Sequence, residues 1–295
     1  MQVIETIRAL QLLSEAERGA GQTIALVPTM GALHEGHLAL VDAARARADR
    51  VWVSIFVNPT QFNEPSDLDA YPRQLATDLA ACRERGVDVV FHPSVEEMYP
   101  DGAQTVVTVR ELSQPLCGAS RPGHFDGVTT IVSKLLLAAK PHVAVFGEKD
   151  YQQLAIIRRM VSDLGFDVEI DGVPTVREPD RVALSSRNVR LSDASRAQAC
   201  VLVAALDAAE RAVTAGETSI ERLLFLVRNE IGKAPLARID YVELRDPDSL
   251  SAVTEITDRA ALLALAVGFP AKDGDSESIR LIDNRVLRPA RGHVD

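Results

Sequence analysis

The stretch from Ile24 to Leu38 most constrains what this chain can fold into. An apolar, β-prone run ends at Pro28, the chain turns at Gly31, and a helix-like pattern follows. A strand, a tight turn and a helix start aim unpaired backbone N–H groups and the positive end of the helix dipole at one point, where a phosphate can sit. The stretch therefore predicts a phosphate or nucleotide site at the end of a strand.

Two histidines, His34 and His37, stand at this junction. They could simply share one face of a first helical turn. A zinc site is less well supported, because the two-histidine metalloprotease motif needs i, i+4 spacing, whereas these are i, i+3 and lack an obvious third ligand. Gly31 and Gly36 have no side chains, so a bound phosphate and base can approach the main chain. The strand–turn–helix context favours the nucleotide site.

Composition limits the class of protein. A chain of 295 residues is long enough for one large or two ordinary domains, and 46% hydrophobic with 25% charged residues is typical of a soluble globular protein. Asp and Glu number 42 against 32 Lys and Arg, which argues against a nucleic-acid partner. Three cysteines without Cys-x-x-Cys spacing fit a reduced cytosol. With no signal sequence or membrane-length apolar run, we expect a cytoplasmic protein without a membrane partner.

Strand-like and helix-like patterns alternate over residues 1–175. Helical patterns cover 1–20, 73–86 and 128–139. Buried-type strands occur at 51–57 and 142–146, further strands at 88–92 and 166–170, and an exposed or edge strand is expected at 104–109. This alternation predicts an α/β fold with a doubly wound parallel sheet. The chain has neither a Gly-x-Gly-x-x-Gly fingerprint nor a Walker lysine motif, which argues against a dinucleotide dehydrogenase and a P-loop enzyme.

Residues 176–295 follow a different pattern. Helical patterns at 193–215 and 218–232 are followed by strand-like runs at 239–244, 261–267 and 279–283. We therefore expect a second, smaller α+β domain that begins at about residue 176.

Polar side chains follow two of the predicted buried strands. One strand ends at Asn58, with Gln61 just beyond, and open α/β sheets bind ligands at this end of their strands. An Asn-Pro turn explains Asn58 but not Gln61. The other strand leads through Gly147 to Lys149 and Asp150, which could form a surface pair worth ~0–1 kcal/mol. The repeated strand, glycine and helix start favours a Lys149 that faces phosphate.

Two polar loops are further candidates. The glycine-rich stretch Cys117–Gly127 contains Arg121 and His124, which suit either a functional loop or an ordinary surface. The run Ser185-Ser-Arg-Asn188 offers two hydroxyls, a guanidinium and an amide that could bind several phosphate oxygens. It is equally compatible with a helix N-cap or a turn.

Six motifs follow one another along the chain. They are Val27-Pro-Thr-Met-Gly-x-Leu-His-x-Gly-His37, Ser54-Ile-Phe-Val-Asn-Pro-x-Gln-Phe62, Arg121-Pro-x-His-Phe125, Gly147-Glu-Lys-Asp-x-Gln-Gln153, Leu184-Ser-Ser-Arg-Asn188 and Arg280-Leu-Ile-Asp-Asn284. Together they closely resemble the pantothenate synthetase family, over residues 1–289.

The resemblance implies an enzyme that condenses (R)-pantoate with β-alanine. ATP would go to AMP and pyrophosphate, with Mg²⁺ present, through a pantoyl-adenylate intermediate. The family belongs to the nucleotidylyl-transferase-like group, so residues 1–175 would form a Rossmann-like ATP- and pantoate-binding domain. Residues 176–295 would form a C-terminal lid, and the protein would be a homodimer.

The resemblance also assigns residues. His37 is the implied proton donor, and Gln61 and Gln153 are the implied pantoate ligands, with Gln61 also near β-alanine. Asn58 and Arg121 are further substrate-binding candidates, and no protein ligand for a metal is predicted. The implied ATP ligands are Met30, Gly31, His34, Gly36, His37, Gly147, Lys149, Asp150, Val176, Leu184, Ser185, Ser186 and Arg187, and the implied catalytic set is His34, His37, Lys149, Ser185, Ser186 and Arg187.

The chemistry needs such residues for its own reason. A carboxylate is a poor acyl donor, so it must first attack the α-phosphate of ATP, and that step needs cations and hydrogen-bond donors around the departing pyrophosphate. A nucleotidylyltransferase for a phosphorylated alcohol is one alternative, but its acceptor would call for more cations than Gln61 and Gln153 provide. A non-catalytic nucleotide-binding protein is another, but it would be expected to have lost some of His34, His37, Lys149 and Arg187.

Two departures from the family pattern stand out. Arg181 occupies a place where the family usually has glycine, so it would strain or reshape the turn if that turn needs a positive φ. It could instead add a cation near the phosphates. The charged segment 271–278 resembles an insertion before the last motif and is expected to be a solvent loop.

Overall fold

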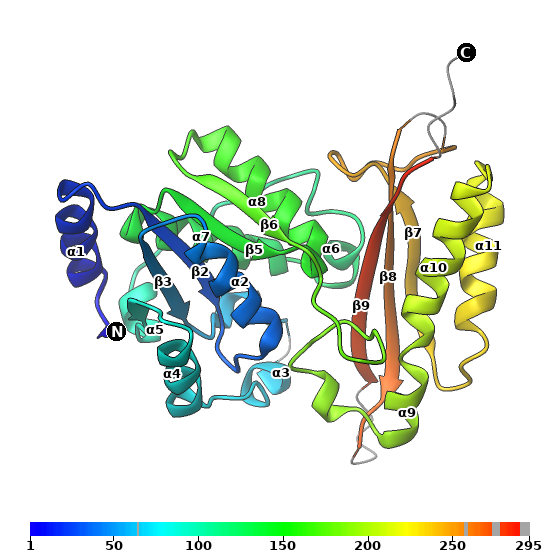
Figure 1. Ribbon diagram of the computed structural model, residues 1–295, viewed down its shortest axis with the longest axis horizontal. Helices are drawn as coiled ribbons and strands as arrows, with labels where there is room; N and C mark the ends of the chain where they lie inside the picture. Colours follow the sequence, from blue (N-terminus) through cyan, green and yellow to red (C-terminus); the bar gives the residue numbers. More distant parts are fainter. Residues whose placement is uncertain (64, 257–258, 273–277, 290–295) are drawn as a thin grey trace. The chain divides into compact units, whose positions relative to one another are not determined.

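The computed structural model describes residues 1–63, 65–256, 259–272 and 278–289, and it divides into two compact units, Met1–Thr175 and Val176–Asp295 (Figure 1). Each unit has its own sheet and its own covering helices. Residues 273–277 of the expected 271–278 insertion lie outside the described residues.

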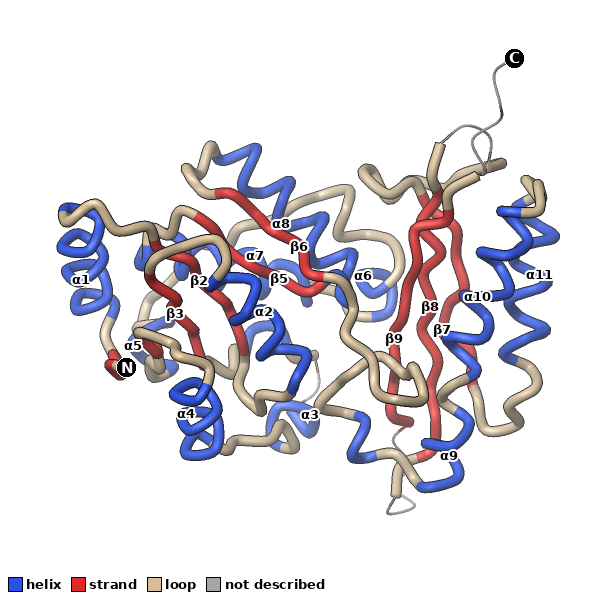
Figure 2. The backbone as a smooth tube through the Cα atoms, viewed as in Figure 1, coloured by secondary structure: helices blue, strands red, loops and turns tan. Residues whose placement is uncertain are grey.

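The first unit is built on a parallel sheet. Over the described residues this sheet has six strands in the order β1-β4-β3-β2-β5-β6, and every pairing is parallel (Figure 2). The predicted α/β fold with a doubly wound parallel sheet is confirmed. The strands are β1 (Gln2–Ile4), β2 (Ile24–Thr29), β3 (Arg50–Ile55), β4 (Val89–Phe91), β5 (Val143–Gly147) and β6 (Glu169–Val173).

The strand order reverses between β2 and β5. β3 and β4 follow β2 on one side, whereas β5 and β6 lie on the other. Thr29 at the end of β2 pairs with Ile55 at the end of β3, so these two strands end at the same level. In open α/β sheets such a reversal leaves a crevice beyond the carboxyl ends of the strands, where ligands bind. The segments that follow β2, β3 and β5 therefore share one edge of the sheet.

Helices cover both faces of this sheet. α2 (Glu35–Arg45) and α4 (Leu75–Glu84) pack on one face, around a core that includes Val27, Val53 and Val145. α1 (Ile7–Gly19), α7 (His124–Ala139) and α8 (Tyr151–Leu164) pack together and against β2, β5 and β6. The remaining described helices of this unit are short: α3 (Pro65–Asp69), α5 (Val95–Met98), α6 (Cys117–Ser120) and the 3-10 turns Pro59–Gln61 and Glu148–Asp150.

The N-terminal helix predicted over 1–20 is partly wrong, because the chain begins with strand β1. Gln2 N donates a hydrogen bond to Asp88 O and His92 N donates one to Ile4 O, both at 2.8 Å, which adds β1 to the sheet beside β4. The helix starts only after Thr6, whose Oγ1 accepts from Ala9 N at 3.3 Å. The threonine N-cap is the signal for the start of the helix, which apolar spacing alone did not reveal.

The edge strand predicted over 104–109 is also wrong, because this segment is irregular. Its backbone hydrogen bonds go to side chains of α7 instead of to a strand. Val107 N donates to Thr130 Oγ1 at 3.0 Å, and Val107 O accepts from the hydroxyl of Thr129. Alternating residue types predicted a strand, but the partner strand does not exist among the described residues.

The second unit is an antiparallel sheet with helices on it. Over the described residues the strands run β7 (Arg238–Arg245), β8 (Ala261–Pro270), β9 (Ser278–Leu287), with β8 in the middle and buried along nearly its whole length. α10 (Val201–Thr214) and α11 (Ile220–Ile231) share a core with this sheet, and the short α9 (Asp193–Gln198) precedes them. The predicted α+β character of this part is confirmed.

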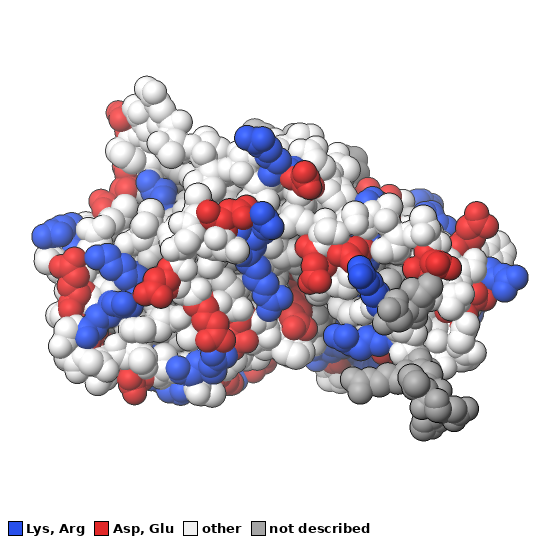
Figure 3. All heavy atoms as spheres, turned by 90° about the horizontal axis from the view of Figure 1, so that it is seen from above, with Lys and Arg blue, Asp and Glu red and all other residues white. Residues whose placement is uncertain are grey.

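Charged side chains of both signs are interspersed over the face drawn in Figure 3. Several form ion pairs that join elements of the first unit, such as Arg85 with Glu35 and Asp42, and Arg45 with Asp88. None of the helices that the structure describes is both long and apolar enough to pass through a lipid bilayer.

Candidate active site

A buried carboxylate, Asp78 of α4, holds the turn after β2. Its Oδ2 accepts a hydrogen bond from Ala32 N at 2.9 Å, and its Oδ1 accepts one from Leu33 N at 2.8 Å. Gly31 has a φ of +84°, and a Cβ atom there would lie 2.9 Å from Asp78 Oδ2, so the turn needs glycine. Asp78 was not predicted from the sequence, although a charged residue four positions before the buried Cys82 on one helix was the available signal.

His34 is the N-cap of α2, and its Nδ1 accepts a hydrogen bond from Gly36 N at 3.1 Å. Gly31 N donates to Thr29 Oγ1 at 3.1 Å. Together with the two N–H groups bound to Asp78, four N–H groups of this junction have acceptors inside the protein. The prediction that the junction offers unpaired N–H groups is wrong for these four, because local side chains accept from them. Side chains therefore carry a larger share of any anion binding here.

The two imidazole rings of the junction lie against each other. The ring centroids of His34 and His37 are 4.2 Å apart, with an interplanar angle of 32°. Burial, together with the charges of His34 and Lys149, lowers the pKa of His37 from 6.5 to about 3, while Asp150 acts in the opposite direction. His37 is therefore neutral at pH 7 in the protein without ligand. Its Nδ1 is buried and has no hydrogen-bond partner among the described residues.

This burial predicts how the free energy of unfolding depends on pH. Between pH 3 and 6.5 the unfolded chain binds a proton at His37 that the folded protein does not. The stabilising contribution is therefore complete above pH 6.5 and is lost as the pH falls toward 3. Relative to His37→Gln, the wild type should lose about 2–3 kcal/mol more free energy of unfolding between pH 7 and pH 4.5. Urea unfolding of both proteins at both pH values measures this, and equal losses would contradict it.

Lys149 and Asp150 follow β5, directly beside β2 in the sheet. The Lys149 side chain is 21% exposed, and its Nζ lies 3.8 Å from Asp150 Oδ2. Since the charges of both residues act on His37, the turn after β5 and the turn after β2 form one electrostatic environment. The structure thus brings the pair His34 and His37 together with the pair Lys149 and Asp150, although more than a hundred positions separate the two pairs in the sequence.

Asn58 and Gln61, which follow β3, are directly connected. Asn58 Nδ2 donates to Gln61 Oε1 and to Gly127 O, both at 3.1 Å, and its Oδ1 accepts from Tyr99 Oη and Thr60 Oγ1. The amide of Asn58 therefore uses its full hydrogen-bonding capacity inside the protein, and the residue is only 1% exposed. This geometry favours a supporting role over the substrate contact expected from the sequence.

The hydrogen bond from Asn58 holds the side chain of Gln61 in place. Its Nε2 lies 2.9 Å from Met30 Sδ, which joins the turn after β3 to the turn after β2. His124 Nδ1 lies 2.7 Å from Gln61 O, and Arg121 Nη2 donates to the same oxygen at 3.2 Å. Arg121 was expected to contact substrate, and His124 was not assigned. In the structure both hold the main chain of Gln61.

Two consecutive glutamines at the start of α8 differ in environment. Gln152 is buried, accepts from Cys117 N and donates to Leu112 O and Pro115 O, so it ties α8 to the loop before α6. Gln153 is half-buried, and within the described part of the chain no hydrogen bond reaches its side chain. Of the two amides, only that of Gln152 is engaged within the described residues, and the pantoate contact that the resemblance implies for Gln153 stays a prediction.

In the second unit, residues 176–184 form a hairpin. Leu184 N donates to Val176 O at 3.0 Å, so two expected ATP ligands that are eight positions apart lie side by side. Ser185 Oγ accepts from Arg187 N at 3.3 Å, which bends the chain after the hairpin. Asn188 Nδ2 then donates to Ala183 O at 3.0 Å. Residues 185–187 therefore form a turn, held by these hydrogen bonds, that lies outside any helix.

Arg181 lies at the tip of this hairpin with a φ of +72°, in the region that favours glycine. Both of its terminal nitrogens donate to Asp207 of α10, at 2.7 and 3.1 Å. The strain expected from the sequence is present, and the guanidinium is bound to a carboxylate.

Replacing Arg181 with glycine should therefore have two opposing effects. It relieves the positive φ, but it removes an ion pair in which the Arg181 side chain is 57% exposed, and such pairs contribute little. We expect the Tm to change by no more than about 3 °C and activity to stay at the wild-type level. Thermal unfolding and a rate assay check this. A Tm lower by 10 °C would mean that the pair with Asp207 matters more than its exposure suggests.

The fold and these contacts define a class: an α/β protein whose polar side chains gather beyond the carboxyl ends of three neighbouring parallel strands, at the point where nucleotides bind in such sheets. A family model described as Pantoate-beta-alanine ligase matches residues 2–286. A pantothenate synthetase from Geobacter sulfurreducens is 50% identical over 287 residues, which cover 97% of this chain and 99% of that protein. The chain belongs to the pantoate-beta-alanine ligase family.

Solved structures agree over the full length. The pantothenate synthetase of Thermus thermophilus superposes with a TM-score of 0.89 at 44% identity, over 98% of this chain and 100% of that one. The pantoate-beta-alanine ligase of Francisella tularensis, complexed with beta-gamma ATP and beta-alanine, superposes with a TM-score of 0.77 at 34% identity, over 97% of both chains.

Proposed function

We propose that this protein joins pantoate to β-alanine with ATP, through a pantoyl-adenylate intermediate. One observation carries the proposal: in a chain that matches the ligase family over residues 2–286, His34, His37 and Lys149 lie together at the strand reversal of a parallel sheet. The complex of the Francisella relative with a form of ATP and β-alanine supports the same substrates here.

In the first step, a pantoate carboxylate oxygen attacks the α-phosphorus of ATP. The bond from that phosphorus to the bridging oxygen breaks, and pyrophosphate leaves with the negative charge. Lys149 is our candidate for stabilising this charge, because a cation in a partly water-excluded site acts strongly on a developing anion. Because His37 is neutral, we assign it the role of an N–H donor to a phosphate oxygen instead of a resting proton donor.

Gln61 and Gln153 are our candidates for binding pantoate. Both are half-buried, and both belong to segments that begin at the carboxyl ends of strands. Asn58, Arg121 and His124 then act through Gln61, by fixing its side chain and its main chain. In the second step the β-alanine amine attacks the acyl carbon of the adenylate, AMP leaves, and the amine loses a proton. This step depends mainly on proximity and on exclusion of water.

The second unit carries the remaining residues that we assign to ATP. We assign Val176 and Leu184–Arg187 to ATP, with Arg187 as the phosphate-binding cation, and we propose that residues 176–295 act as a lid. Magnesium would bind together with ATP, as the counter-ion of its phosphates. The residues fit this role, because Mg²⁺ is usually held by one or two carboxylates together with phosphates, and the half-exposed Asp150 lies beside Lys149. We also expect a homodimer, which analytical ultracentrifugation would test.

Pyrophosphate release measures the proposed function directly. The enzyme is incubated with MgATP and (R)-pantoate, first alone and then with β-alanine, and the product masses are recorded. We expect pantoate-dependent pyrophosphate release, with the mass of pantothenate only after β-alanine is added. If well-folded protein releases no pyrophosphate in response to pantoate, the proposal is wrong, and a different acid or acceptor must be sought.

A further inference from the structure

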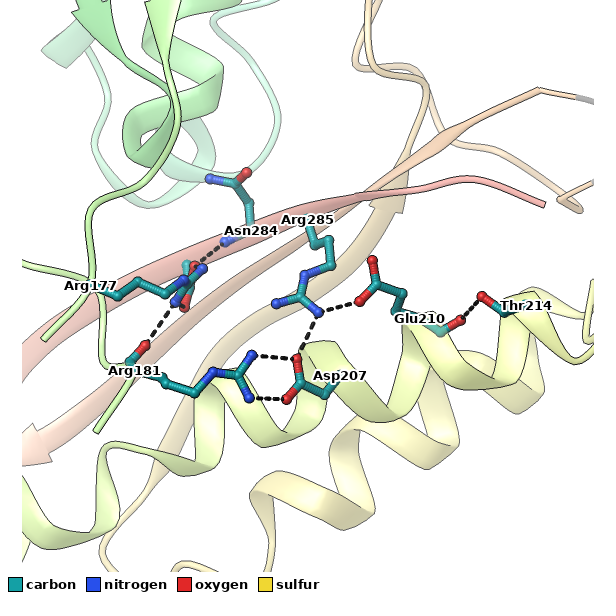
Figure 4. A network of polar contacts seen from close by, with 8 residues as sticks. Arg177, Arg181, Asp207, Glu210, Thr214, Asn284 and Arg285 are labelled. Atoms are coloured by element: carbon teal, nitrogen blue, oxygen red, sulfur yellow. Dashed lines mark hydrogen bonds and ion pairs between the residues drawn. The ribbon is translucent and has the colours of Figure 1, made fainter. Parts of the chain in front are cut away.

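The last family motif, Arg280–Asn284 on β9, has no role in the chemistry above. Its Asp283 is buried, with a side chain only 2% exposed. A buried carboxylate needs a partner, and Arg177 supplies one through two parallel hydrogen bonds of 2.7 and 2.9 Å. Asn284 N donates to the same carboxylate at 2.8 Å (Figure 4).

Arg177 belongs to the hairpin 176–184. Its main chain bridges to Ala183, one position from the pair formed by Val176 and Leu184. Its Nη1 also donates to Arg181 O at 3.0 Å, at the tip of the hairpin. A single guanidinium therefore ties the arm of the hairpin and its tip to a central position of β9, where Asp283 is opposite Leu265 of β8.

We propose that Arg177 and Asp283 form a positioning pair for the nucleotide, which sets the place of Val176 and Leu184 and of the Ser-Ser-Arg turn that follows. This inference rests on the proposed function, which assigns ATP to those residues. A bidentate pair fixes orientation as well as distance, so it can hold a main-chain segment in one register. Neither residue is a catalytic residue, because both act through the hairpin.

A second ion-pair network on the hairpin provides an internal comparison. Arg181 and Arg285 share Asp207, and Arg285 also pairs with Glu210 at 2.6 Å (Figure 4). The Arg181 side chain is 57% exposed, against 20% for Arg177, so water competes more strongly for the Arg181–Asp207 pair, which is the part of this network that reaches the hairpin. The positioning role therefore falls to the buried pair.

ATP affinity tests the proposal. Binding of MgATP to the full-length protein is measured by titration calorimetry, together with the KM for each of the three substrates. In Asp283→Asn we expect the Kd and KM for ATP to rise about tenfold, because a charge-assisted bidentate contact is lost, while the KM values for pantoate and β-alanine stay within about twofold. Asp240→Asn is the matched control, since it removes the carboxylate that pairs with Arg280 of the same strand.

A double variant separates positioning from stability. Arg177→Met with Asp283→Leu replaces the buried pair by apolar side chains, which often restores or exceeds wild-type stability. We expect this variant to regain its Tm but to keep the weakened ATP binding. If ATP binding is normal in Asp283→Asn, or returns together with the Tm in the double variant, the pair only supports the fold and the inference is wrong. A wild-type protein that binds ATP but makes no pantothenate would refute the proposed function and leave this comparison intact.

Discussion

The Lys149→Ala enzyme should form pantothenate with a kcat lowered by about 100-fold or more, because it loses a cation that acts on charge developing in the transition state. The Lys149 side chain is only 21% exposed, and its charge reaches His37 across the strand reversal. Since the contact strengthens as pyrophosphate departs, kcat and kcat/KM should fall together. Steady-state kinetics with each substrate varied in turn measures both.

Lys233→Ala is the matched control for this prediction. Lys233 is 67% exposed and pairs with Glu230 three positions earlier on the surface of the second unit. Its loss should leave kcat unchanged. Turnover of Lys149→Ala close to that of Lys233→Ala would remove Lys149 from the mechanism.

Asp78→Ala should be the most damaging change outside the substrate contacts. It leaves the N–H groups of Ala32 and Leu33 without their acceptor, which should lower the free energy of unfolding by about 2–5 kcal/mol. The turn that carries His34 and His37 would also lose its shape, and a misplacement of ~1 Å costs about 100-fold in rate. Urea unfolding and kcat of the fraction that remains folded test the two effects separately.

Glu84→Ala provides the comparison on the same helix. Glu84 is an exposed acidic residue at the end of α4, so its loss should change stability by no more than about 0.5 kcal/mol. If both variants lost the same free energy of unfolding, the loss would come from changing α4 in general and not from removing the carboxylate of Asp78.

The sequence revealed the parallel sheet because buried strands and amphipathic helices leave different periodicities. The same periodicities put Asn58, Gln61 and Lys149 just beyond strand ends, and strand order alone then gathers them. Roles within that group were harder to predict. Asn58 and Arg121 have the residue types of ligands, but their hydrogen bonds are directed at other parts of the protein.

The missing predictions share a physical cause. Asp78, His124 and Asp283 act through partners that are from 45 to 106 positions away in the chain, so a local pattern, such as the spacing of Asp78 from Cys82, does not reveal what they bind. The segment 104–109 shows the same limit for secondary structure. Its alternation of residue types is typical of a strand, but a strand forms only beside a partner strand. Here the backbone of the segment is hydrogen-bonded to threonine hydroxyls of α7 instead.

The hydrogen bonds around Asn58 also fix the orientation of the Gln61 side-chain amide. Two hydroxyls, from Tyr99 and Thr60, donate to Asn58 Oδ1, so the amide of Asn58 can only turn its N–H₂ toward Gln61 Oε1. The other end of the Gln61 amide is then the donor, with its Nε2 near Met30. If Gln61 binds pantoate as proposed, a group that meets its Nε2 would have to be an acceptor, such as a hydroxyl or carboxylate oxygen, because an amine or amide N–H at that place would face another donor.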